Sequence, residues 1–143
     1  MHQLKEIRTS LEVGFPDGEL PASYAPLRGK DSRTVGAVNE FPYEDAQFDA
    51  VLMDGAAVSA GRVKEAHRVL KSEGRLYFTV PEKTKKQEGY ALPDIYALVR
   101  YGFNIVDVAR PAWWLFGSRG RTISICAQKK NWKNLSTVYR PLI

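Results

Sequence analysis

The strongest constraint on the fold of this chain is a pair of apolar runs separated by an amphipathic segment. The first run, Phe48–Met53, is apolar enough for a central strand covered on both faces. The second spans residues 75–80, and between them residues 59–70 place apolar side chains at helical spacing. Because parallel neighbours in one sheet need a crossover, we expect residues 48–53 and 76–80 to be adjacent, buried parallel strands. The helix at 59–70 is then their right-handed crossover.

Local sequence signals mark the ends of two predicted helices. Ser59 is a candidate N-cap for the first, and Gly74 is a candidate stop signal after it. Pro93 suits the first turn of a second helix at residues 93–101, with Gly102 following its end.

Four further segments complete the pattern. Runs at 104–109 and 122–128 favour strands, and without a helix between them they can pair only antiparallel if they are neighbours. Upstream, residues 11–13 and 34–38 are short β-favouring runs. Prolines exclude a long helix from residue 17 to residue 33. The alternation of strands and helices predicts an α/β sandwich.

The length of 143 residues suits one domain, which we place at residues 1–130 with a C-terminal tail at 131–143. Residues 1–61 carry 5 basic and 10 acidic side chains, whereas residues 62–143 carry 16 and 6. The basic half could attract nucleic acid or an acidic partner, or simply form a solubilising surface. No apolar run suits a membrane span, and the start lacks a hydrophobic signal core, so we expect a cytoplasmic protein. The single cysteine, Cys126, should be a buried, unreactive thiol.

Two motifs in the middle of the chain resemble class I S-adenosylmethionine-dependent methyltransferases. Residues 41–53, Phe-Pro-Tyr-Glu-Asp-Ala-Gln-Phe-Asp-Ala-Val-Leu-Met, are similar to the family segment "LPFEDNSFDVVL". Residues 64–81, Lys-Glu-Ala-His-Arg-Val-Leu-Lys-Ser-Glu-Gly-Arg-Leu-Tyr-Phe-Thr-Val-Pro, resemble "EAYRVLKPGGRLVISVP". Order and spacing match over residues 34–130. The chain therefore resembles the type 11 branch of the family, shortened and degenerate in its N-terminal, cofactor-binding half.

The resemblance implies a Rossmann-like sandwich with a mainly parallel sheet and an antiparallel last strand. Only residues 19–33 separate the first motif from the next strand, so about one strand and two helices of the family are missing at the front. The implied activity is methyl transfer from S-adenosylmethionine to an unknown acceptor, in a site outside the carboxyl ends of the strands. The alternative is a non-catalytic methyltransferase-like domain that binds protein or oligomerises.

The family's first motif, E/D-x-G-x-G-x-G, implies a cofactor-binding turn at residues 12–18. Glu12, Gly14 and Gly18 match the acid and the outer glycines, but Pro16 replaces the middle glycine. Proline removes a backbone N–H and fixes φ near −65°. An ordinary surface turn is the alternative interpretation of this segment.

The acids expected further along depend on the alignment. One alignment puts Ala37 where the family has an acid beside the adenine amino group. If residues 34–38 instead replace the second strand, Asn39 or Glu40 takes the ribose-binding place. Either way a polar contact is lost, at a cost of about 1–3 kcal/mol, or roughly tenfold to hundredfold in affinity. We therefore expect cofactor affinity in the high micromolar range or none. An open cleft at the strand ends over residues 14–40 would favour an active methyltransferase. A cleft filled by side chains would favour the non-catalytic domain.

Few residues suggest chemistry directly. Asp54, after the strand at 48–53, could orient a nucleophile or simply start a turn. His67 lies on an apolar helix face and should be packed, and no metal-site spacing occurs. The aromatic run at residues 113–116 could fold back on the sheet or contact a partner.

Association is the last expectation from the sequence. The missing block should leave the edge beside the strand at 11–13 short or bare, with Leu11, Val13 and Phe15 as apolar residues there. We expect a homo-oligomer or a protein partner, with nucleic acid as the less favoured partner and no membrane association.

Overall fold

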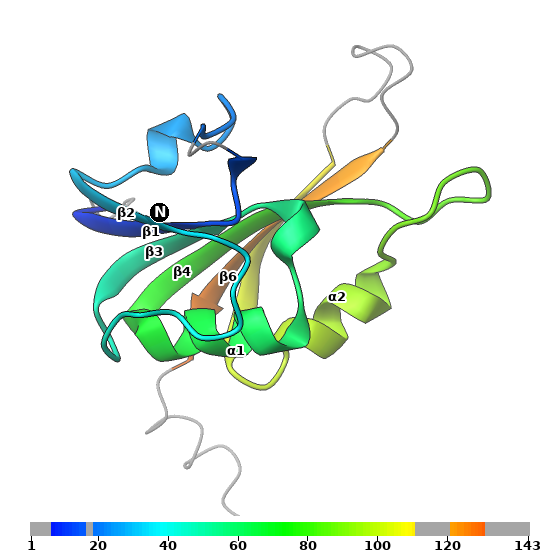
Figure 1. Cartoon of the computed structure of the whole chain (residues 1–143). Helices are drawn as coiled ribbons and strands as arrows, with labels where there is room; N and C mark the ends of the chain where they lie inside the picture. Colours follow the sequence, from blue (N-terminus) through cyan, green and yellow to red (C-terminus); the bar gives the residue numbers. More distant parts are fainter. Residues whose placement is uncertain (1–6, 17–18, 111–120, 131–143) are drawn as a thin grey trace, which may run out of the picture.

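A single six-stranded sheet organises the computed structural model, which describes residues 7–16, 19–110 and 121–130 (Figure 1). The strand order is β2-β1-β3-β4-β6-β5. The strands are β1 (Thr9–Val13), β2 (Asp31–Val35), β3 (Phe48–Met53), β4 (Leu70–Pro81), β5 (Phe103–Ala109) and β6 (Thr122–Lys129). The helices are α1 (Ala60–Val69) and α2 (Leu92–Val99), with short 3₁₀ turns η2 (Ala25–Leu27) and η3 (Gly55–Ala57).

The sheet has a parallel and an antiparallel part. β1 pairs in parallel with β2 and β3, and β3 pairs in parallel with β4. β6 is antiparallel to both β4 and β5. The sequence-based expectations of adjacent parallel strands β3 and β4, of α1 between them and of an antiparallel final pair are confirmed. The chain has the predicted Rossmann-like sandwich, and β2 lies directly beside β1, as the second strand of such a sheet does.

The position of β2 and the signal that ends α1 differ from those expected. β2 begins at residue 31 and ends at 35, so it lies earlier than the predicted run at 34–38. Gly74 does not stop α1, because the helix ends at Val69 and Leu70 is already extended. Residues 71–74 form an irregularity in β4, where Glu73 has a φ of 66° and the register with β3 shifts. Gly74 serves this bulge: a Cβ there would lie 2.9 Å from the Lys71 carbonyl oxygen.

The main core lies between the sheet and the two α-helices, which share one face (Figure 1). α1 begins at Ser59, whose side chain accepts a hydrogen bond from the Arg62 amide at 3.2 Å, so the predicted N-cap is confirmed. α1 buries three residues against the sheet and α2 buries two. The buried helix residues are Val63, Ala66, Val69, Ile95 and Val99.

His67 of α1 is partly buried and packs against β5, as expected. Its ring meets Phe103 edge-on, with ring centroids 5.3 Å apart. Gly102 makes room for it, because a Cβ at Gly102 would lie 2.4 Å from His67 Cδ2. Burial lowers the pKa of His67 to about 4, and the charge of Lys129 adds to that effect. Cys126 is also buried, and burial raises the pKa of its thiol.

An irregular segment covers the opposite face of β1. The Gly29 amide donates to Ser10 Oγ at 2.9 Å, and Arg28 pairs with Glu12. Residues 20–30 therefore lie on the side of the sheet away from α1 and α2 (Figure 1). The only helical piece between residues 19 and 33 is η2, in agreement with the prolines there.

The connection from β2 to β3 is a loop that runs along α1. Arg62 donates to the carbonyl oxygens of Ala37 and Val38 at 2.7 and 3.3 Å. One turn later, Glu65 Oε1 accepts from the Phe41 amide at 2.8 Å, and Arg68 donates to the Phe41 carbonyl at 2.9 Å. Side chains at this spacing share one face of a helix, so α1 fixes the whole loop.

The sheet edge beside β1 is short rather than bare. β2 pairs along all of β1, so β1 is not an edge strand, and Leu11 and Val13 are fully buried in the main core. The idea that they form an apolar edge is therefore wrong. β2 itself exposes Asp31 and Arg33, charges that discourage edge-to-edge pairing. Among the described residues no helix is both long and apolar enough to cross a membrane. The aromatic run at 113–116 and the tail at 131–143 lie outside the described residues.

Candidate functional site

The carboxyl ends of β1, β2 and β3 converge at one place. Gly14 follows β1, and its amide donates to the Val35 carbonyl oxygen of β2 at 2.9 Å. Asp54 follows β3, and its amide donates to the Val13 carbonyl oxygen at 2.9 Å. In open parallel sheets this is the edge where ligands bind. The candidate site is therefore built from residues 14–16, 36–38 and 54–57.

Gly14 has a conformation that favours glycine, and a side chain at this position would clash with Ala57. Its φ is +77°. A Cβ built on it would lie 2.6 Å from the Cβ of Ala57 and 3.8 Å from that of Ala37. Ala57 is 2% exposed and belongs to η3, which follows β3. The space that a side chain at residue 14 would occupy is thus taken up by a methyl group of the chain itself.

Glu12 is engaged in an ion pair. It is 3% exposed, and its Oε1 accepts from Arg28 Nε at 2.8 Å and from Arg28 Nη2. Arg28 comes from the segment between β1 and β2, and its side chain is 42% exposed. The carboxylate therefore binds this connecting segment to β1. A buried carboxylate needs such a partner, because an uncompensated charge is costly there.

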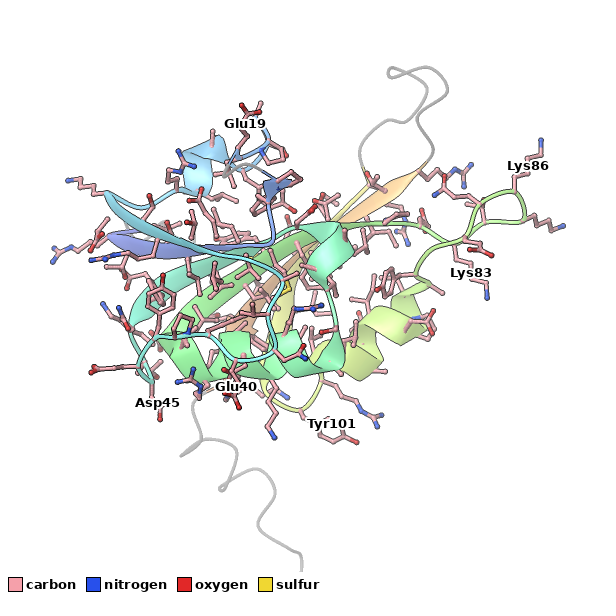
Figure 2. All side chains as sticks on the ribbon, in the orientation of Figure 1. Glu19, Glu40, Asp45, Lys83, Lys86 and Tyr101 are labelled. Atoms are coloured by element: carbon pink, nitrogen blue, oxygen red, sulfur yellow. The ribbon has the colours of Figure 1, made fainter. Side chains whose placement is uncertain are left out.

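The other predicted cofactor residues do not gather at the strand ends. Residues 36–38 after β2 are Gly-Ala-Val, and the Ala37 and Val38 carbonyls are bound by Arg62. Asn39 and Glu40 are exposed and lie farther along the β2–β3 loop, which runs beside α1, where Figure 2 labels Glu40. Gly18 lies outside the described residues.

Asp54 begins a turn. Its carbonyl oxygen accepts from the Ala57 amide at 2.8 Å, which closes η3. The adjacent Gly55 is required by close approach, because a Cβ there would lie 2.1 Å from the Thr79 carbonyl oxygen of β4. The turn interpretation thus accounts for residues 54–57 without a substrate.

Sequence reasoning missed Tyr24, which covers the ends of the strands. It is 6% exposed, and its ring packs T-shaped on Phe15 with centroids 5.4 Å apart. Its hydroxyl lies near Thr79 of β4 and the charge of Asp54, and burial raises its pKa. The only signal in the sequence was an aromatic residue within a proline-rich stretch, which does not indicate where it packs.

These residues do not match what S-adenosylmethionine would require. The adenosine part needs close approach to a glycine turn and a carboxylate for the ribose hydroxyls. Here Ala57 packs on Gly14, and the residues that directly follow β2 are Gly36, Ala37 and Val38, none of which carries a carboxylate. Whether Glu12, Gly14, Asn39 and Glu40 contact a cofactor remains a prediction.

Solved methyltransferases share this fold. An S-adenosylmethionine-dependent methyltransferase from Methanosarcina mazei superposes with a TM-score of 0.65 at 15% identity, covering 89% of this chain and 94% of the other. A Burkholderia thailandensis 1,6-didemethyltoxoflavin-N1-methyltransferase, with 1,6-didemethyltoxoflavin and S-adenosylhomocysteine bound, gives a TM-score of 0.59 at 20% identity, covering 86% of this chain and 71% of the other. A putative methyltransferase from Haloferax volcanii, in complex with the Trm112 methyltransferase activator, gives 0.64 at 13%, covering 90% and 85%. No protein-family model and no curated protein match the sequence. The fold is that of class I S-adenosylmethionine-dependent methyltransferases.

Proposed function

We propose that this chain is a non-catalytic methyltransferase-fold module whose own side chains occupy the place of the cofactor. The observation that carries the proposal is the packing of the Ala57 methyl group on Gly14, at the turn where the fold would hold S-adenosylmethionine. In a cofactor-binding turn, glycine lets the ligand approach the backbone. In this chain the same glycine lets η3 approach.

Two further contacts support the proposal. The Glu12–Arg28 pair attaches residues 19–30 to β1, and a cofactor that used Glu12 would have to separate it. Breaking a buried ion pair typically costs about 3–5 kcal/mol, and somewhat less where one partner is partly exposed as Arg28 is. Tyr24, 94% buried over the end of β4, would also have to move. Each rearrangement reduces the affinity that a ligand can reach.

The role of such a module is to bind a partner. The Haloferax volcanii neighbour, a putative methyltransferase in complex with an activator, shows that this fold can form a heteromeric complex. Self-association is the other form that partner binding could take. Either would need an interface of about 1,000 Å² or more to be specific.

A methyltransferase with weak cofactor affinity is the second candidate. The positive φ of Gly14 and the position of Asp54 at the end of β3 favour it. Methyl transfer from a sulfonium depends largely on holding the acceptor in line, so few catalytic side chains are needed. In this candidate Asp54 would orient the acceptor, and Tyr24 would have to move off the strand ends.

Isothermal titration calorimetry with S-adenosylmethionine and S-adenosylhomocysteine tests the proposal. We expect no saturable heat, or a dissociation constant in the high micromolar range. Binding near 1 μM, about −8 kcal/mol, would contradict the proposal and favour the enzyme. The variant Tyr24→Ala measures how much the Tyr24 side chain hinders ligand binding. The control is Tyr101→Ala, which changes a tyrosine that is 72% exposed. We expect neither variant to bind tightly, because Ala57 and the Glu12–Arg28 pair remain.

A further inference from the structure

A lysine-bearing hairpin projects from the end of β4. This lysine hairpin comprises residues 82–90 and carries Lys83, Lys85 and Lys86, all exposed. Figure 2 shows Lys83 and Lys86 pointing away from the body of the protein, on a loop that extends beyond the sheet. Its position at the carboxyl edge places it outside the residues that fill the ends of β1–β3.

Hydrogen bonds fix the shape of the lysine hairpin. The Lys83 amide donates to the Tyr90 carbonyl oxygen at 3.0 Å, and the Thr84 amide donates to the Gln87 carbonyl oxygen at 2.9 Å. The Gln87 side chain donates to the carbonyl oxygens of Glu82 and Arg121 at 2.8 and 2.9 Å. The lysines are therefore presented from an anchored backbone.

The charge around the hairpin is predominantly positive. Arg110 and Arg121 lie at its base, and Arg110 Nε pairs with Glu82 Oε2 at 3.0 Å. Five cations thus gather with two carboxylates, Glu82 and Glu88, and Glu82 is already engaged. None of the ion pairs among the described residues uses the three lysines. The whole chain has a net charge of +5 and an isoelectric point near 9.4.

The chemistry of the hairpin favours nucleic acid over protein. A protein interface draws most of its affinity from buried aromatic or aliphatic anchors. The large exposed apolar side chains of the described residues are Val38, Tyr96, Tyr101 and Val106, and they lie outside the hairpin. Binding to a phosphate backbone needs only cations, and lysine supplies compact, flexible point charges.

We propose that the lysine hairpin binds the phosphate backbone of nucleic acid without reading its sequence. The inference is independent of the proposed function, because the hairpin shares no residue with the filled strand ends. A negative result for nucleic-acid binding would therefore not contradict the proposed function, and the reverse also holds. RNA and DNA offer the same phosphate chemistry, and oligonucleotides of each type separate them in the test.

Fluorescence anisotropy of the full chain with fluorescein-labelled 20-mers of uridine and of thymidine tests this inference. At 50 mM KCl we expect saturable binding. Neutralising three phosphates of a single strand gives a log–log salt slope of about −2, or roughly a fifteenfold loss of affinity between 50 and 200 mM. The triple variant Lys83→Gln, Lys85→Gln and Lys86→Gln should make the slope shallower by about 2 and weaken binding at least tenfold at 50 mM, since those contacts are gone.

A charge-matched control is available on other surfaces. The triple variant Lys30→Gln, Lys64→Gln and Lys71→Gln removes the same charge from three exposed lysines elsewhere. This control variant should show the same log–log slope of affinity against salt concentration as the unmodified chain. The proposal fails if the chain shows no saturable binding at 50 mM KCl, or if the control variant loses as much affinity as the hairpin variant. It also fails if a 20-residue glutamate peptide displaces the oligonucleotide at equal concentration, which would indicate an acidic protein partner.

Discussion

Replacing Gly14 by alanine should destabilise the fold strongly, for two separable reasons. The φ of +77° costs a residue with a Cβ about 1–2 kcal/mol. The new methyl group would also lie 2.6 Å from the Ala57 Cβ, and overpacking of this kind costs about 1–3 kcal/mol. We expect Gly14→Ala to lower the free energy of unfolding by about 2–5 kcal/mol. That is a large part of the total for a small domain.

Urea unfolding followed by circular dichroism measures this change as a shift of the midpoint. The double variant Gly14→Ala/Ala57→Gly removes the clash and keeps the backbone strain, so it should recover about 1–3 kcal/mol. Gly36→Ala is the matched control at the end of β2. Apart from Gly36 itself and its two neighbours in the chain, no residue has a heavy atom within 4 Å of its Cβ position. We expect its stability to change by less than about 0.5 kcal/mol.

The reasoning is refuted if Gly14→Ala unfolds at the same urea concentration as Gly36→Ala. That result would mean that η3 does not pack on Gly14, and that the turn has room for a ligand. A double variant no more stable than Gly14→Ala would assign the whole cost to backbone strain.

Three further changes test neighbouring parts of the structure. The pKa of His67 is about 4 in the folded chain and about 6.5 in the unfolded chain. The contribution of neutral His67 to the free energy of unfolding is therefore complete above pH 6.5 and is lost as the pH falls toward 4. The stability difference between wild type and His67→Gln should narrow by about 2–3 kcal/mol between pH 7 and pH 4, and pH-independence of that difference would contradict the burial. Arg28→Met leaves the carboxylate of Glu12 buried and unpaired and should cost about 1–3 kcal/mol in thermal unfolding; a neutral outcome would mean that the pair does not hold residues 19–30. Ser59→Ala removes the N-cap of α1 and should cost about 1 kcal/mol, and no loss would place the helix start elsewhere.

The parts of the fold that the sequence predicted are those with strong periodicity. β3, α1 and β4 follow from two apolar runs and one amphipathic helix, because burial of those faces leaves few alternatives. The antiparallel β5–β6 pair follows from the lack of a crossover helix between them. The sequence placed the start of β2 too late, because the residues of this strand are mostly polar and exposed and show no apolar pattern.

The candidate site was less predictable because it depends on contacts between distant segments. The first motif identified Glu12 and Gly14, but their partners, Arg28 and Ala57, lie 16 and 43 positions away. Tyr24 looks like a loop residue in the sequence, and only the folded chain shows it packed over the end of β4. A glycine that admits a cofactor and a glycine that admits an alanine look the same in a motif.

The most direct test of the filled site is an amide chemical-shift titration of the isotope-labelled chain with S-adenosylhomocysteine. The amides of Gly14, Asp54 and Ala57 follow the carboxyl ends of β1 and β3, the edge at which sheets of this kind bind ligands. We expect no shift at these three amides that saturates below about 1 mM ligand, or about −4 kcal/mol. Saturable shifts at all three with a low-micromolar midpoint would contradict the proposal that the chain's own side chains occupy this site.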